Sequence, residues 1–149
     1  MIKLVWDLPN PLILRTRVEQ AHIDGLDHTN NAVYVQWCEQ AAWSHSAALG
    51  LDLDAYRRLD RGMAVTRGEY DYLQASRAGD EIAVGTWIVN WDGKLTMQRH
   101  FQVIRESDGV TLLRGAVRFV CIELSSGRPR RLPPAFVEGY GPAVLGLEC

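Results

Sequence analysis

The spacing of hydrophobic and polar positions changes along the chain, and this change predicts which segments are helical and which are extended. Residues 12–18 alternate and are rich in β-prone side chains, which is typical of a strand. Residues 32–49 instead carry apolar and small side chains at helical spacing. Asn30 and Asn31 precede this stretch and Gly50 follows it, and these residue types favour the two ends of a helix. We therefore expect a first strand followed by one long helix.

The chain after residue 62 has the pattern of extended strands. Four β-prone runs follow one another, at residues 63–73, 81–91, 94–106 and 110–124. The dipeptides Asp92-Gly93 and Asp108-Gly109 separate the last three runs, and Asp-Gly favours tight hairpins because glycine tolerates a positive φ. The last three runs are therefore predicted to form an antiparallel meander.

The order of these elements predicts the fold class. Two short helical segments are expected besides the long helix, at residues 55–59, capped by Asp52 or Asp54, and at residues 135–140. One long helix is then available to cover one face of the sheet. We predict an α+β fold in which an antiparallel sheet wraps around a long central helix. Without repeats or linkers, residues 1–149 are expected to form a single domain.

Composition and charge exclude several classes of protein. The 149 residues are 47% hydrophobic with a formal net charge of -2, so we expect no nucleic-acid partner. No apolar run approaches the ~20 residues that cross a bilayer, and the N-terminus lacks the apolar stretch of a signal peptide. Cys38, Cys121 and Cys149 show no C-x-x-C spacing, which favours reduced thiols over disulfides. These features predict a cytoplasmic protein without a membrane partner.

Residues 19–31 concentrate side chains that could carry chemistry, with two His, two Asp and two Asn before the expected helix. The first N–H groups of a helix lack intrahelical partners and favour an anion, so they can form an oxyanion hole for an attacked carbonyl. A carboxylate upstream could attack that carbonyl or activate water. The same residue types are also common in loops that only cap a helix. The spacing of His22, Asp24 and His28 is not typical of a zinc site, and we expect no metal.

A resemblance to a known family favours the chemical interpretation. The segment DGLDHTNNAVY, residues 24–34, is similar to the D-x-x-x-H-x-N-N-x-x-Y signature of hot-dog fold thioesterases. These include 4-hydroxybenzoyl-CoA thioesterase, the YbgC-like acyl-CoA thioesterases and, more distantly, the plant acyl-ACP thioesterases. Residues 68–73 and 78–82 resemble the second strand and Gly-Asp turn of that family, and residues 127–133 resemble its usual ending.

The resemblance implies a role for each matching residue. Asp24 matches the aspartate that acts as nucleophile or general base, and Asn31 matches the position whose backbone N–H polarises the thioester carbonyl. His28 matches the histidine that shapes the active-site loop or takes part in catalysis. Asn30 matches an asparagine that fixes the loop, and we expect it among the substrate-binding residues. Tyr34 is expected to pack inside the helix.

The resemblance also implies an activity and partners. The expected reaction is acyl-CoA plus water giving a carboxylic acid and CoA, without a cofactor. The phosphates of CoA need positive charge, and Arg128, Arg130 and Arg131 are candidates for it. Hot-dog domains pair their open sheet edges by self-association, so a homodimer or homotetramer is expected.

Several alternatives remain open at this point. His22 stands where many YbgC-like relatives have an aspartate, and Leu26 stands where the acyl-ACP enzymes have an asparagine. Asp27, Glu39 and Glu69 are weaker rival carboxylates. The rival functions are a hydratase or dehydratase of acyl thioesters on the same fold, and a non-catalytic acyl-CoA binding module.

A cysteine and a histidine on the expected helix form another candidate pair for nucleophilic chemistry. Cys38 and His45 lie seven residues apart on the expected helix, about 10 Å along its axis. This distance is too long for a hydrogen bond, so both are expected to belong to the core.

Overall fold

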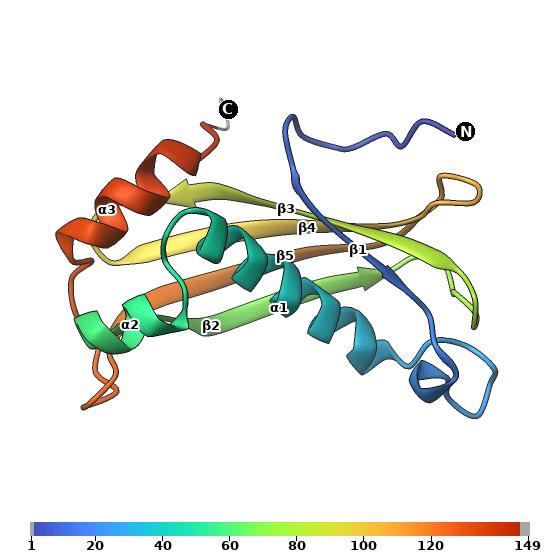
Figure 1. Cartoon of the computed structure of the whole chain (residues 1–149), viewed down its shortest axis with the longest axis horizontal. Helices are drawn as coiled ribbons and strands as arrows, with labels where there is room; N and C mark the ends of the chain where they lie inside the picture. Colours follow the sequence, from blue (N-terminus) through green and yellow to red (C-terminus); the bar gives the residue numbers. More distant parts are fainter. Residues whose placement is uncertain (1, 147–149) are drawn as a thin grey trace. The chain divides into compact units, whose positions relative to one another are not determined.

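The computed structural model describes residues 2–146, and its elements follow the predicted order (Figure 1). They are β1 (Leu12–Arg17), a 3-10 helix (Gln20–His22), α1 (Asn31–Ala48), α2 (Leu53–Leu59), β2 (Arg61–Tyr72), β3 (Glu81–Trp91), β4 (Thr96–Arg105), β5 (Thr111–Glu123), α3 (Pro134–Tyr140) and a second 3-10 helix (Gly141–Ala143). The sequence predicted the strands and the three α-helices but neither 3-10 helix. Cys149, predicted to be a reduced thiol, lies outside the described residues.

The five strands form one sheet in the order β1-β3-β4-β5-β2. β1 pairs antiparallel with β3, and Leu14 lies opposite Val84 in the register. β3, β4 and β5 are neighbours in chain order, and their connections contain Gly93 and Gly109 at φ values of 72° and 73°. The prediction of a meander with Asp-Gly turns, and of an α+β fold, is confirmed. β1 and β2 are the two edge strands.

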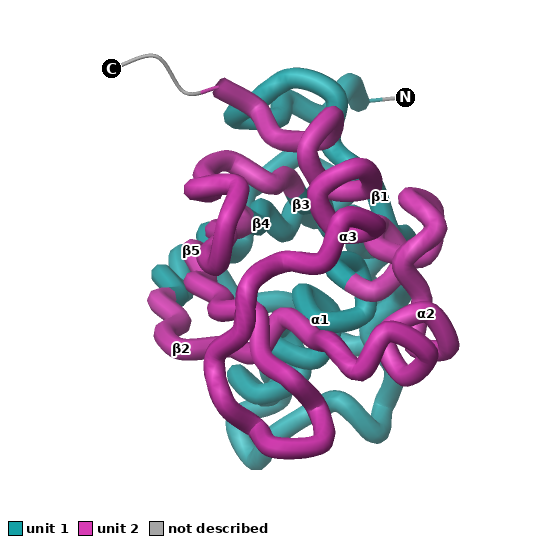
Figure 2. Tube along the Cα trace, turned by 90° about the vertical axis from the view of Figure 1, so that its left-hand side faces the viewer, with its two compact units in different colours: residues 1–42, 70–86, 101–115 teal, residues 43–69, 87–100, 116–149 magenta. Residues whose placement is uncertain are grey.

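The chain divides into two compact units, coloured separately in Figure 2. Unit 1 contains residues 1–42, 70–86 and 101–115, and unit 2 contains residues 43–69, 87–100 and 116–149. Each unit takes part of α1 and part of the long strands. The single domain over residues 1–149 stays a prediction.

Helix α1 begins and ends at the residue types that the sequence indicated. The Asn30 side chain accepts a hydrogen bond from the Ala32 N–H over 3.0 Å, as an N-cap does. Gly50 follows the helix at a φ of 82°, and the Leu51 N–H donates to the Ser46 carbonyl over 2.8 Å. This is the Schellman termination, in which glycine takes the left-handed position. No helix among residues 2–146 is long and apolar enough to cross a membrane.

In unit 1, the residues before β1 lie against the sheet although they form no helix or strand. A Cβ on Gly85 would lie 2.6 Å from a ring carbon of Trp6, so glycine is required for this close approach. The Asp7 carboxylate pairs with the Arg114 guanidinium over 2.7 Å. The buried Gln102 side chain accepts from the Asp7 N–H over 2.8 Å. These contacts fix residues 6 and 7 on strands β3, β4 and β5.

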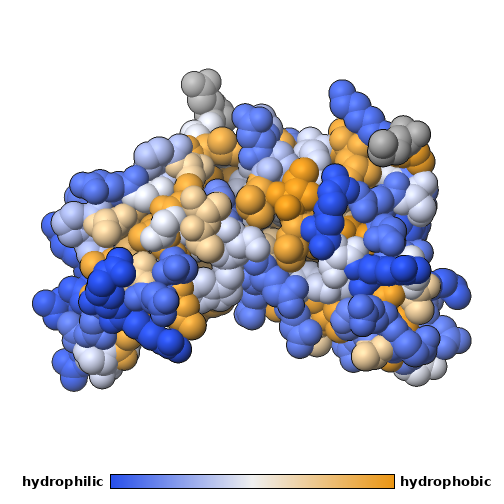
Figure 3. All heavy atoms as spheres, in the orientation of Figure 1, coloured by the Kyte–Doolittle hydropathy of each residue, from blue (hydrophilic) through white to orange (hydrophobic). Residues whose placement is uncertain are grey.

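The surface mixes hydrophilic and hydrophobic side chains, and the face seen in Figure 3 carries both. Two of the exposed large apolar residues lie on edge strand β2, where Val65 is 56% and Tyr72 is 46% exposed. An edge strand with exposed apolar side chains is a surface on which another chain can add a strand.

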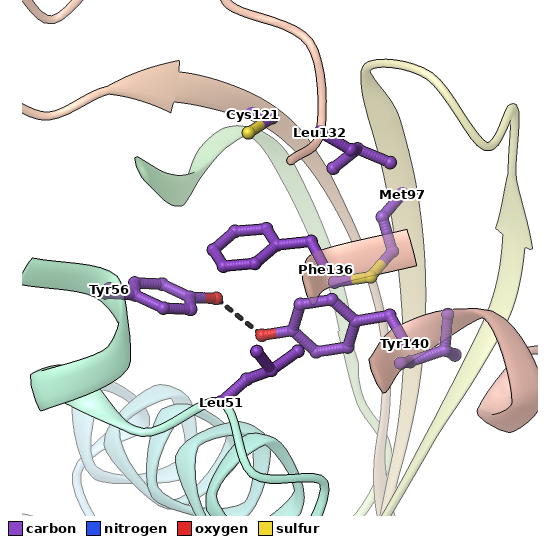
Figure 4. Packing of buried hydrophobic residues seen from close by; sticks show 8 residues of the cluster. Leu51, Tyr56, Met97, Cys121, Leu132, Phe136 and Tyr140 are labelled. Carbon is purple, nitrogen blue, oxygen red and sulfur yellow. Dashed lines mark hydrogen bonds between the residues drawn. The ribbon is translucent and has the colours of Figure 1, made fainter. Parts of the chain in front are cut away.

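In unit 2, an apolar cluster surrounds the hydrogen-bonded hydroxyls of Tyr56 and Tyr140 (Figure 4). The Tyr56 and Tyr140 hydroxyls lie 2.5 Å apart, and the Ser46 hydroxyl lies 2.8 Å from that of Tyr140. The side chains packed in this cluster include Leu51, Met97, Cys121, Leu132 and Phe136. The hydroxyls satisfy one another, so this core accommodates polar groups without access to water.

The Tyr140 hydroxyl should therefore stabilise unit 2. Replacing Tyr140 by Phe leaves the Tyr56 and Ser46 hydroxyls each with one partner fewer, and should lower the free energy of unfolding by about 1–3 kcal/mol. Urea unfolding measures this loss. Tyr72→Phe is the matched control, because Tyr72 is 46% exposed and its hydroxyl is removed from a position open to water. Equal midpoints for wild type and Tyr140→Phe would contradict the role of the network.

Candidate active site

The loop before α1 folds back on itself as a tight turn. Ile23 and Thr29 pair as an isolated antiparallel bridge. Inside this bridge, the Asp24 N–H donates to the His28 carbonyl over 2.8 Å. Asp27 takes a left-handed φ of 61°, which lets the chain reverse within five residues. The loop thus brings His28 beside Asp24.

The Asp24 carboxylate has one oxygen engaged in the loop and one that is not. Its Oδ1 accepts from the Leu26 N–H over 2.8 Å and from the His28 N–H over 3.2 Å. Its Oδ2 accepts no hydrogen bond from any group in the described part of the chain. Asp24 as a whole is half-buried. Oδ1 therefore has the role of a group that stabilises the loop, and Oδ2 is the oxygen that a catalytic role of Asp24 would use.

The first turn of α1 leaves one backbone donor without a protein partner. The Ala32 N–H is bonded by the Asn30 side chain, and the Val33 N–H donates to the Asn30 carbonyl over 2.9 Å. The Asn31 N–H donates to no acceptor among residues 2–146. It also lies at the positive end of the helix dipole, where a negative oxygen is favoured.

A hollow of about 260 Å³ in unit 1 brings these groups together. Asp24, His28 and Asn31, the three residues predicted to be catalytic, all line it. Its other lining residues are Leu26, Thr29, Tyr34, Tyr72, Leu73, Gln74 and Ala75. One wall therefore comes from the loop and the start of α1, and the other from the end of β2 and the segment after it.

The fold and this hollow can be compared with known proteins. A family model described as the thioesterase-like superfamily matches residues 18–139. This chain belongs to the thioesterase-like superfamily. The match covers more than half of the chain and includes every residue that lines the hollow. The resemblance to thioesterases that the sequence indicated is thereby confirmed at the level of the superfamily.

One curated relative and two solved structures are similar to this superfamily member. Protein THEM6 of Danio rerio is 31% identical over 98 residues, which are 65% of this chain and 47% of that protein. The match therefore spans about half the length of that relative. Slr0204, a 1,4-dihydroxy-2-naphthoyl-CoA thioesterase from Synechocystis, has 19% identity and a TM-score of 0.76, covering 85% of this chain and 93% of its own.

The second structure is the protein SAV2348 from Staphylococcus aureus in complex with CoA. It has 18% identity and a TM-score of 0.81, and the similarity covers 94% of this chain and 89% of that one. At these identities the two structures show the shared fold, and the predicted hot-dog fold is confirmed.

Other residues singled out in the sequence lie outside the hollow. Asn30, expected to bind substrate, caps α1 and is not among the lining residues. His22 accepts from the Glu19 N–H through Nδ1 over 3.0 Å, and its ring meets that of Trp37 edge-on with centroids 5.7 Å apart. His22 therefore packs against Trp37 and caps the 3-10 helix.

The rival carboxylates do not line the hollow either. Asp27 is exposed at the loop turn, and Glu39 is exposed on α1. Glu69 accepts a hydrogen bond from the Arg67 side chain over 2.7 Å. Among the described carboxylates, Asp24 alone lines the hollow.

The arginines predicted to bind CoA lie after β5, in unit 2. Arg128, Arg130 and Arg131 are all exposed, and Arg130 pairs with Glu123. The hollow belongs to unit 1, and binding of CoA by these arginines stays a prediction.

The pattern along the chain gave no signal for Ser76, which the structure places against Thr29 and Tyr34, two residues that line the hollow. Ser76 is fully buried, and its hydroxyl lies 2.7 Å from that of Thr29 and 2.6 Å from that of Tyr34. Tyr34 packs inside α1 as expected and also takes part in this network. A lone serine in a loop carries no recognisable spacing, so only tertiary contacts identify it.

Cys38 and His45 are both unsuited to nucleophilic chemistry. Burial raises the pKa of the Cys38 thiol to about 12, which keeps it protonated. Burial, with a smaller effect of the Arg99 charge, lowers the pKa of His45 to about 4. The partner of the His45 ring is Arg99, whose guanidinium lies 2.9 Å from Nδ1. Within residues 2–146, no group of three or more His, Cys, Asp and Glu is arranged to hold a metal.

The hydrogen bonds to Asp24 predict how substitutions affect the loop. Asp24→Ala removes the acceptor of two N–H groups and should lower the free energy of unfolding by about 1–2 kcal/mol. Asp24→Asn keeps an oxygen at the Oδ1 position and should cost less than about 0.5 kcal/mol, because the loop stays bonded. Urea unfolding of the two variants tests this. If both lose the same stability, the capping role of Oδ1 is wrong.

His45 should make stability depend on pH. Its pKa is about 4 in the folded protein and 6.5 ordinarily, so the unfolded chain binds the proton first as the pH falls. Its contribution is therefore present above about pH 6.5 and is lost as the pH falls toward 4. Unfolding midpoints measured across this range should fall less steeply for His45→Gln than for wild type. Parallel pH profiles would show that His45 is not the titrating group.

Proposed function

We propose that this protein hydrolyses acyl-CoA thioesters to a carboxylic acid and CoA. The observation that supports it is that Asp24 and Asn31 line one hollow, and that each keeps a polar atom without a hydrogen-bond partner in residues 2–146. These atoms are Oδ2 of Asp24, an acceptor, and the backbone N–H of Asn31, a donor. A nucleophile or base and an oxyanion donor are the two groups that thioester hydrolysis requires.

The proposed mechanism begins with the thioester carbonyl oxygen accepting from the Asn31 N–H. Attack on the carbonyl carbon places negative charge on that oxygen, and the helix dipole stabilises it. In one route Asp24 attacks, the C–S bond breaks to release the CoA thiolate, and water hydrolyses the resulting mixed anhydride. In the other, Asp24 removes a proton from water, which attacks instead. Both routes use the Oδ2 oxygen.

His28 contributes first through its backbone. Its N–H donates to Asp24 and its carbonyl accepts from the Asp24 N–H, so the carboxylate is held in one orientation. Its side chain also lines the hollow, where it can contact the substrate. Asn30 contributes by capping α1, which holds the first turn and the Asn31 N–H in place.

The CoA portion of the substrate is proposed to contact arginines. One structure similar to this chain is described as a complex with CoA. Arg128 and Arg131 are exposed and form no ion pair within the described residues, so both are available to phosphate oxygens. Arg130 is also exposed but shares Glu123.

The proposal includes a homodimer or homotetramer and a cytoplasmic location. Edge strand β2 carries the exposed Val65 and Tyr72, and pairing it with a second copy would bury both. Cys38 and Cys121 are free thiols, which fits a reducing compartment.

Thiol release from acyl-CoA esters tests the function. A panel from C2 to C18, with benzoyl-CoA and phenylacetyl-CoA, is incubated with wild type and with Asp24→Asn. Wild type should cleave at least one ester. The variant should lose at least ~100-fold in kcat, about 2.7 kcal/mol of transition-state stabilisation, because the amide is neither nucleophile nor base.

Asp24→Asn is the informative variant because it should preserve the loop. Glu39→Gln is its matched control, since it neutralises an exposed carboxylate outside the hollow and should keep full activity. If Asp24→Asn is as active as wild type, Asp24 is not the catalytic group. If wild type cleaves no ester, hydration of enoyl-CoA and equilibrium binding of acyl-CoA become the assays that decide between the two rival functions.

A further inference from the structure

We propose that Ser76 is a positioning residue that holds the two walls of the hollow in register through the hydroxyls of Thr29 and Tyr34. The inference rests on the proposed function. Ser76 lies in the segment between β2 and β3, whereas Thr29 and Tyr34 lie on either side of the start of α1. The three hydroxyls therefore connect the wall that carries Asp24 and Asn31 to the opposite wall.

The contacts among these residues are short and buried. The Ser76 hydroxyl lies 2.7 Å from that of Thr29 and 2.6 Å from that of Tyr34, and the exposed fractions are 0% for Ser76, 2% for Thr29 and 3% for Tyr34. The Thr29 N–H also donates to the Ser76 carbonyl over 2.9 Å. Three neutral hydroxyls without access to water hold fixed places because each depends on the others.

The direction of hydrogen bonding follows from the carbonyl. A carbonyl oxygen can only accept, so the Thr29 hydroxyl donates to the Ser76 carbonyl, over 3.3 Å. The Ser76 hydroxyl then donates to Thr29, and the Tyr34 hydroxyl donates to Ser76. Each hydrogen has an acceptor in this arrangement, and Ser76 is the only member that contacts both others.

The places of Thr29 and Tyr34 on α1 explain why this link controls the helix end. Thr29 immediately precedes the N-cap Asn30, and Tyr34 is the fourth helical residue. These are the two positions that a hydrophobic staple joins to fix the angle at which the chain enters a helix. Here hydroxyls replace the apolar contact, and Ser76 joins them from another segment. Along the chain, Asn31 lies between Thr29 and Tyr34, the two residues that Ser76 contacts.

The opposite wall is fixed by the same segment. Gln74 and Ala75 line the hollow directly before Ser76. The Arg105 guanidinium donates to the Ala75 carbonyl over 2.8 Å and is itself held by the Asp108 carboxylate. Ser76 therefore connects a wall anchored on β4 to the wall that carries the reacting groups.

Loss of this connection should affect the chemical step more than substrate binding. A displacement of about 1 Å between reacting groups can cost ~100-fold in rate. We expect Ser76→Ala to lower kcat at least ~10-fold while KM changes less than ~3-fold, because the groups that bind the ester remain present.

Ser46→Ala is the matched control in the same experiment. Ser46 is also a buried serine, bonded to the Tyr140 hydroxyl over 2.8 Å, but it lies in unit 2 and does not line the hollow. The Ser46→Ala variant should be less stable than wild type, as Ser76→Ala should be, but it should keep the wild-type kcat. Tyr34→Phe should lower kcat, while Thr29→Ser, which keeps the hydroxyl, should restore it relative to Thr29→Val. If Ser76→Ala does not fold, the Tyr34 and Thr29 variants decide.

Amide hydrogen exchange tests the positioning without any substrate. Ser76→Ala should speed exchange at the Leu26 and His28 amides, which donate to Asp24, and Ser46→Ala should not. Unchanged exchange at both amides together with wild-type kcat in Ser76→Ala would overturn the inference. If exchange rises but wild type cleaves no ester, the positioning stands and the proposed function fails.

Discussion

The backbone N–H groups in the first turn of α1 have no partners inside the helix, and the loop before the helix is organised by this constraint. The Asn30 side chain and carbonyl engage two of these donors, whereas the N–H of Asn31, a residue that lines the hollow, has no acceptor among residues 2–146. The Asp24 carboxylate likewise satisfies backbone donors of the loop, since its Oδ1 accepts from two N–H groups. Its Oδ2 accepts from none among residues 2–146. Most of these groups are satisfied, and one donor and one acceptor remain on two residues that line the same hollow. These two groups are the candidate chemistry of this superfamily member.

Buried hydroxyls hold the structure together in both units. In unit 1 they join the start of α1 to the segment after β2 through Ser76, and in unit 2 they join Ser46, Tyr56 and Tyr140 inside an apolar cluster. Such networks constrain geometry more sharply than apolar packing, because a hydrogen bond weakens steeply when its angle changes. The network of Ser76 involves two residues that line the hollow, where reacting groups must be aligned. The network of Tyr140 instead stabilises the apolar cluster of unit 2.

The hollow and the exposed surface differ in the charged side chains that they carry. Among the described carboxylates, only Asp24 lines the hollow, so no second acid competes with it for a proton. The three arginines after β5 are exposed, where a charged group retains hydration and can still meet phosphate. In unit 2 the imidazole of His45 lies beside the Arg99 guanidinium, and its lowered pKa keeps it neutral. It is therefore a packing group and not a proton carrier at neutral pH.

Local sequence patterns predict the order of the elements, the ends of α1, the Asp-Gly turns and the segment that carries Asp24, His28 and Asn31. These depend on local rules, since caps, turns and strand periodicity are set by residues within a few positions of one another. The family signature is local in the same way. Only the tertiary structure showed that His22 packs against Trp37, that Oδ2 of Asp24 is the oxygen left without a partner, and that Ser76 contacts Thr29 and Tyr34. Ser76 lies 47 residues from Thr29 along the chain, and no local pattern encodes a contact that exists only after the sheet brings the two segments together.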